Sequence, residues 1–144
     1  MFSPGHAGAN AYARVGVETA VTGASPHRLI VLLYQGARQA IAQARMHFQQ
    51  GNVAERGMAI SKAIRIVESG LQQSLSLEIG GEIAGRLNAL YSYMTRRMLQ
   101  ANVLQSEEML VEVDGLLATL EEAWIGIAPE VARMAAQPAA ETVR

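Results

Sequence analysis

Cysteine is absent from the 144-residue chain, and this absence excludes several functions. A chain without thiols forms no disulfide bond, no thiolate metal site and no cysteine nucleophile. It is also compatible with a reducing compartment, and we expect a cytoplasmic protein. Aromatic residues are scarce as well, at 5% of the sequence.

Charge of either sign is not in excess. The chain has 12 Lys and Arg against 13 Asp and Glu, a formal net charge of -1, and its basic residues are scattered. A nucleic-acid groove or an anionic-membrane anchor usually shows a basic stripe, so we expect neither partner. Long hydrophobic runs are also missing, since no window approaches the roughly 20 apolar residues of a membrane span. We therefore expect no membrane insertion.

Proline is confined to positions 4, 26, 129 and 138, which leaves a long central region without helix-breaking residues. Apolar residues recur there at spacings of three and four, which is typical of amphipathic helices. Ser25 and Pro26 can begin a helix and Gly51 can end it, while Asn52 and Ser106 are candidate caps for later helices. The predicted long helices cover residues 26 to about 50, 53 to about 76, 82 to about 103, and 107 to the proline at 129.

Short connections between four long helices make each helix turn back on the one before it. We therefore predict an all-α fold, an antiparallel up-and-down four-helix bundle, with a short extra N-terminal helix over 12–22. Residues 1–129 are expected to form a single helical-bundle domain, with 1–11 mobile and 130–144 a disordered tail.

Catalytic and metal-binding patterns are weak. The three histidines, at positions 6, 27 and 47, have no metal-ligand spacing, and no Glu-x-x-His pair occurs. Adjacent glutamates such as Glu107 and Glu108 point about 100° apart on a helix. GGEIAG lacks the ending of a phosphate-binding loop. We predict no enzyme, no metal site and no cofactor, and the rival hypothesis of an enzyme using the bundle interior has little support.

Several helices carry more apolar residues than one buried stripe requires. In LYSYMTRRMLQAN, residues 90–102, Tyr93 and Leu99 lie on opposite flanks of the stripe, and Met58 lies outside the stripe of the second helix. These side chains are either core positions of a small bundle or part of an exposed groove that takes a partner helix. For the set as a whole, we favour the groove.

Four segments carry a family resemblance when they are read together: AYARVGVETAVTGASPHRLIVLLYQGA, GNVAERGMAISKAIRIVESGL, GGEIAGRLNALYSYMTRRMLQAN and EEMLVEVDGLLATLEEAW. Over roughly residues 12–129 the chain resembles the FliS family of flagellar export chaperones. The resemblance implies a cytoplasmic bundle that binds the disordered C-terminal region of flagellin, prevents its premature polymerisation and delivers it to the flagellar type III export apparatus.

Helical position and resemblance together give a predicted set of partner contacts. Ala11-Tyr12 matches the family's AY element, so Tyr12 is expected to cover the groove and also to contact flagellin, or else simply to anchor the short helix. Arg97 is expected to satisfy partner carbonyls or carboxylates, or to be an ordinary solvated charge. The full set is Tyr12, Val15, Leu33, Tyr34, Ile41, Ile64, Val67, Tyr93, Arg97, Leu99 and Asn102.

The binding class itself has a rival. A homodimeric helical scaffold, binding its own copy or another flagellar regulator, would expose the same apolar stripe. We expect a monomer or weak homodimer in the free state, and export-gate components stay open as further partners.

Overall fold

The structure is a computed structural model that describes residues 25–127, apart from the side chains of 77–79. Within that range every regular element is helical, which confirms the all-α prediction. The elements are α2 (Pro26–Gln50), α3 (Val53–Arg65), the π-helix η2 (Ile66–Gln72), α4 (Leu77–Leu104) and α5 (Glu107–Gly126). The predicted helix at 12–22, the mobile segment 1–11, the tail 130–144 and the proline stop at 129 lie outside the described residues.

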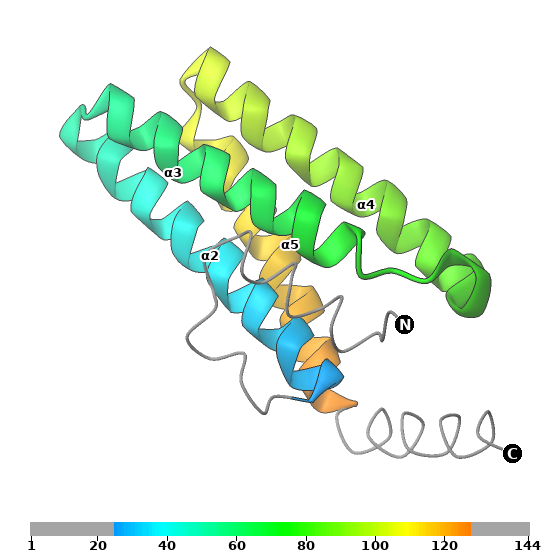
Figure 1. The fold of residues 1–144 in the computed structure, drawn as a ribbon. Helices are drawn as coiled ribbons and strands as arrows, with labels where there is room; N and C mark the ends of the chain where they lie inside the picture. The colour runs from blue at the N-terminus through cyan, green and yellow to red at the C-terminus, as the bar shows by residue number, and fades with distance from the viewer. Residues whose placement is uncertain (1–24, 128–144) are drawn as a thin grey trace, which may run out of the picture.

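The helices form an antiparallel bundle, as Figure 1 shows. The second rod of the bundle is α3 with η2 continuing it. Helix α2 packs against this rod and against α5, and α4 packs against the same two neighbours. The four rods therefore surround a common core, and the predicted up-and-down arrangement is confirmed. No helix within 25–127 is long and apolar enough to cross a bilayer.

Local signals set both ends of α2 as the sequence predicts. The Ser25 hydroxyl accepts a hydrogen bond from the amide of Arg28 at 3.1 Å, and Pro26 is the first helical residue. Gly51 has a φ of 74°, a conformation that glycine adopts without steric cost. Asn52 and Ser106 do occupy cap positions, but neither side chain makes a capping hydrogen bond. The side-chain amide of Asn52 instead donates a hydrogen bond from Nδ2 to Gln50 Oε1 at 3.1 Å.

The second predicted helix changes its winding before it ends. Regular α-helix stops at Arg65, and the chain continues as the π-helix Ile66–Gln72. Helix α4 begins at Leu77, five residues before the predicted start, but Gly81 interrupts it with a φ of 56° and a ψ of -130°. Uninterrupted helix therefore begins at Glu82, where the sequence predicts it.

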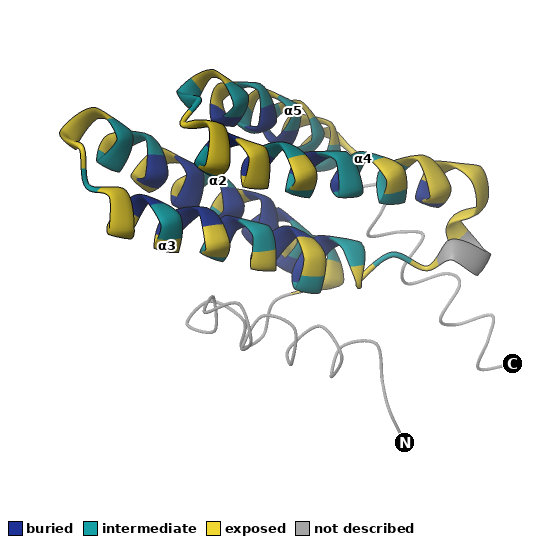
Figure 2. Ribbon diagram, turned by 90° about the horizontal axis from the view of Figure 1, so that it is seen from above, coloured by how far each residue is buried: buried dark blue, intermediate teal, exposed yellow. Residues whose placement is uncertain are grey.

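The core lies between the inward faces of all the helices, which are the dark faces in Figure 2. Its largest fully buried side chains are Leu33, Ile41, Ile66, Val67, Leu71, Met94, Met98, Leu110, Val113 and Leu117. The core also contains a buried polar contact that joins α2 to α4. The hydroxyls of Tyr34 and Tyr91 form a hydrogen bond of 2.6 Å.

Candidate partner-binding groove

Four of the predicted contact residues belong to the core. Leu33, Tyr34, Ile41 and Val67 each have 2% or less of their surface exposed. Helix α2 carries a wide apolar arc because it packs against α3, η2 and α5 together, so that arc needs no external partner. Side chains at this depth touch a second protein only if the bundle opens, and we exclude these four from the candidate contact surface.

Three further predicted contacts do not show where an exposed binding surface lies. Ile64 is half-buried and packs against the core. Tyr12 and Val15 lie outside the described residues. The placement of the remaining four residues, all on α4, therefore decides where an exposed surface lies.

Tyr93 and Arg97 lie on the flank of α4 that faces α5, and both bind Glu112. The Tyr93 hydroxyl donates a hydrogen bond to Glu112 Oε2, and Arg97 Nε donates one to Glu112 Oε1 at 2.9 Å. The Tyr93 bond, with help from Arg97, holds the pKa of Glu112 below its ordinary value. The Arg97 guanidinium also lies 5.9 Å from the Tyr93 ring centre. This flank is closed within the chain, because the two predicted contacts join α4 to α5.

Leu99 and Asn102 lie on the opposite flank, which faces α3. Arg56 Nε donates a hydrogen bond to Asn102 Oδ1 at 3.0 Å, and the Arg56 guanidinium stacks 4.6 Å above the ring of Phe48. This buried arginine fixes Asn102 beside α3. Leu99, three residues before Asn102, shares its flank but is 57% exposed.

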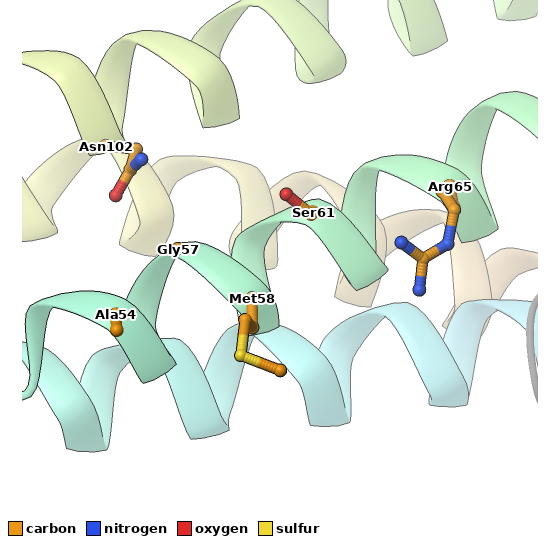
Figure 3. Close-up of a pocket in the computed structure, with 6 residues that line it drawn as sticks. All are labelled: Ala54, Gly57, Met58, Ser61, Arg65 and Asn102. Atoms are coloured by element: carbon orange, nitrogen blue, oxygen red, sulfur yellow. The ribbon is translucent and has the colours of Figure 1, made fainter.

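A hollow of about 400 Å³ lies between α3 and α4, and Figure 3 shows its lining. We call it the α3–α4 groove, lined by Ala54, Gly57, Met58, Ser61, Arg65 and Asn102. Three of its α3 residues are small, so another backbone can approach closely. Met58 is 72% exposed and Val103, four residues after Leu99, is 70% exposed. The hollow is shallow, and large exposed apolar side chains lie in its lining, at Met58, and on α4 near Asn102, at Leu99 and Val103.

None of the five α3 residues in the lining belongs to the predicted contact set, which shares only Asn102 with it. The sequence pattern places Met58 outside the apolar stripe of its helix, but it does not single out Ala54, Ser61 or Arg65. Their shared signal is a second periodicity of three and four, at positions 54, 58, 61 and 65, on the face away from the buried stripe. A polar and small-residue stripe of this kind reads as ordinary solvated surface until a neighbouring helix is placed beside it.

The groove offers surface for binding and no catalytic constellation. Among the described residues, no three His, Asp or Glu side chains gather in a way that could hold a metal ion. Arg65 and Asn102 are the polar groups with long side chains in the lining. Recognition of another protein is therefore the chemistry that this arrangement supports.

Comparison with known proteins gives the same class of function. The family model described as "Flagellar protein FliS" matches residues 8–131. The chain belongs to the FliS family. This is a chaperone family and not an enzyme family, which confirms the prediction that the protein is no enzyme.

Relatives of this FliS-family chain come from several bacteria. The flagellar secretion chaperone FliS of Salmonella typhimurium is 50% identical over 123 residues, which cover 85% of this chain and 91% of the relative. The Escherichia coli protein of the same name is 42% identical, with coverage of 81% and 86%. That of Bacillus subtilis is 28% identical, with coverage of 74% and 78%.

Proposed function

We propose that this protein is a cytoplasmic export chaperone that binds the disordered C-terminal region of flagellin in the α3–α4 groove. Binding covers the segment of flagellin that would otherwise polymerise, and the complex delivers it to the flagellar type III export apparatus. The observation that carries the proposal is the groove itself, with Met58, Leu99 and Val103 exposed beside it in a chain of the FliS family.

The physical requirement for such a chaperone is a large apolar surface. A disordered partner that folds on binding loses conformational entropy, at a cost of about 2 to 5 kcal/mol. Apolar burial is the main term that offsets this cost. The small residues of α3 add to it, because a helix that approaches closely makes more contacts per turn.

The direct test is calorimetric titration of the purified chain with the C-terminal region of flagellin from the same organism. We expect a one-to-one complex with a strongly negative heat-capacity change, the mark of apolar burial. Absence of both heat and complex formation would overturn the assignment to flagellin. The same protein sample, measured alone by light scattering over a range of concentrations, separates this function from a homodimeric scaffold.

Substitutions in the groove locate the contact. Met58→Asp with Leu99→Asp places two charges where the partner's apolar face must lie, and we expect the affinity to fall by about tenfold or more for each side chain. The matched control is Ile83→Asp with Val111→Asp, which adds the same charges to exposed apolar residues away from the groove lining. Equal effects of the two pairs would contradict the location.

The N-terminal segment enters the proposal through Tyr12, which we propose covers the groove in the free chaperone and contacts flagellin in the complex. Tyr12→Ala is expected to change both flagellin affinity and the rate at which a protease cuts the N-terminal segment. If neither quantity changes, Tyr12 has no such role.

A further inference from the structure

The methionines of this chain differ in their access to solvent. The structure describes five of the seven. Met94 and Met98 are 0% exposed in the core, and Met109 is half-buried against it. Met46, on α2, is 43% exposed, and Met58, in the lining of the α3–α4 groove, is 72% exposed. Of these five residues, Met58 is therefore the one that a soluble reagent reaches most readily.

The exposure of a methionine matters because its thioether is open to oxidation. Peroxides convert it into methionine sulfoxide, which replaces a flexible apolar side chain by a polar and chiral one. The chain has no cysteine, so no thiol of the protein competes for the oxidant. A peroxide that reaches the protein therefore meets the Met58 sulfur as the most accessible sulfur atom among the described residues.

The position of Met58 on α3 lets it be oxidised without damage to the fold. Met58 belongs neither to the core nor to the half-buried residues that pack against it. Ser61, Arg65 and Asn102 line the same hollow (Figure 3), so the surroundings of Met58 are partly polar. A sulfoxide oxygen at this place is hydrated in the free protein. Oxidation of Met58 therefore changes the character of the groove and leaves the packing of the bundle intact.

We propose that Met58 is a reversible oxidation site that controls binding in the α3–α4 groove: the thioether form binds the partner, and the sulfoxide form binds it weakly. Hydrogen peroxide transfers one oxygen atom to the sulfur, which loses two electrons. The O–O bond breaks, and the other oxygen leaves as water. A methionine sulfoxide reductase with a dithiol restores the thioether and yields a disulfide and water. The effect on binding rests on the proposed function, whereas the oxidation itself does not.

The sulfoxide weakens the complex because its oxygen loses water when a partner covers the groove. Burial of a polar group without a new hydrogen bond is unfavourable, and we expect a dissociation constant about tenfold higher for the oxidised protein. Leucine at the same position keeps a similar apolar volume and has no sulfur to oxidise. A bound partner also covers the Met58 sulfur, so flagellin should slow its oxidation.

The first experiment treats the intact protein with increasing amounts of hydrogen peroxide and follows each methionine by mass spectrometry. Trypsin separates Met58 from the other methionines, because it cuts after Arg56 and Lys62. We expect Met58 to be oxidised first, Met46 second and the core methionines last. The urea midpoint should stay unchanged while Met58 alone is oxidised. Oxidation of the core methionines before Met58 would overturn the assignment of the site.

Calorimetric titration with the C-terminal region of flagellin then measures the effect on binding. Each protein is compared with its own untreated sample, after limited oxidation and again after reduction by methionine sulfoxide reductases with dithiothreitol. For the parent and for the control Met46→Leu, we expect the affinity to fall about tenfold on oxidation and to recover on reduction. For Met58→Leu, the oxidised and untreated samples should bind equally.

The outcomes separate this inference from the proposed function. If oxidation weakens binding as much in Met58→Leu as in the parent, or if it does not weaken binding in the parent, Met58 does not control the groove while flagellin binding itself stands. If untreated parent protein does not bind flagellin, the proposed function falls and the control of binding falls with it. The order in which the methionines are oxidised is measured without flagellin and does not depend on that result.

Discussion

The hydrogen bond between Tyr34 and Tyr91 is the polar contact that lies deepest in the bundle. Both side chains are 2% exposed and their hydroxyls are 2.6 Å apart. Burial raises the pKa of both phenols above the ordinary value of 10.0, so each keeps its proton at neutral pH. Each hydroxyl depends on the other, because no other hydrogen bond to either hydroxyl is found among the described residues.

Removal of one of the two hydroxyls should lower the free energy of unfolding more than removal of both. Tyr34→Phe leaves the Tyr91 hydroxyl buried without a partner, and we expect the free energy of unfolding to fall by about 1 to 3 kcal/mol. The double variant Tyr34→Phe/Tyr91→Phe removes the unsatisfied group and should recover part of that loss. Urea unfolding followed by circular dichroism measures all four proteins of this cycle. If the two single losses simply add in the double variant, the hydroxyls do not depend on each other.

At the scale of elements, the π-helix η2 matters because Gly70 meets α2 there. A Cβ atom on Gly70 would lie 2.7 Å from Leu33 Cδ2 and 3.1 Å from its Cδ1. Leu33 is fully buried, so its side chain can move only by displacing other residues of a densely packed core. The close approach of η2 to α2 therefore favours glycine at this position.

Gly70→Ala should consequently destabilise the bundle by about 1 to 3 kcal/mol through overpacking. Gly115→Ala is the matched control, since Gly115 is also within a helix, α5, but has no atom within 4 Å of the added Cβ. There alanine should stabilise the protein by about 0.5 to 1 kcal/mol, because it restricts the unfolded chain and favours the helix. The midpoints of thermal and urea unfolding should fall for Gly70→Ala and rise for Gly115→Ala. A stabilising Gly70→Ala would contradict the packing argument.

Helix α5 is attached to its neighbours through carboxylates. Arg45 and Gln49 donate hydrogen bonds to Glu107 and lower its pKa, and Tyr93 and Arg97 do the same for Glu112. A carboxyl with a lowered folded-state pKa contributes stability above its ordinary value of 4.5, and that stability is lost as the pH falls below it.

Acid should therefore weaken the contacts of α5 in particular. We expect the free energy of unfolding to decrease as the solution is taken from about pH 6 to about pH 3, and Glu107→Gln/Glu112→Gln to show a shallower decrease. Urea titrations at a series of pH values supply both slopes. If the free energy of unfolding decreases equally steeply with pH in the parent and the variant, other carboxylates dominate acid unfolding and the prediction is wrong.

At the scale of the whole molecule, the two sides of α4 differ. The side facing α5 is closed by Glu112 with Tyr93 and Arg97, whereas the side facing α3 carries the groove. A partner that binds as proposed should cover one face of the bundle and leave the outer face of α5 in solvent.

Because the chain has no cysteine, single thiols can report which face is covered. Ser61→Cys places a thiol in the groove lining, and Thr119→Cys places one on the exposed face of α5. We expect flagellin to slow alkylation of the thiol at position 61 strongly and to leave that at position 119 unchanged, as measured by mass spectrometry over time. Equal protection of both thiols would show that the partner surrounds the bundle.

The sequence alone determined most of the fold, because the deciding interactions are local. Ser25, Pro26 and Gly51 set the ends of α2 through the backbone conformations and hydrogen bonds that these residue types favour. Spacings of three and four placed the helices, and short connections forced antiparallel neighbours. The motifs were also sufficient to identify the family. The π-helix η2 escaped prediction, because an apolar stripe at helical spacing does not distinguish α from π winding.

Only the tertiary structure decided which apolar flanks are exposed. On α4, Tyr93 and Leu99 look equivalent in the sequence, since both lie beside the buried stripe. The neighbouring helices make them different: α5 supplies Glu112 to Tyr93, whereas Leu99, on the flank beside α3, stays largely in solvent. The wide arc of Leu33, Tyr34 and Ile41 became core for the same reason. Periodicity reports how far a side chain points from the stripe, but exposure depends on which residues the other helices bring to that place.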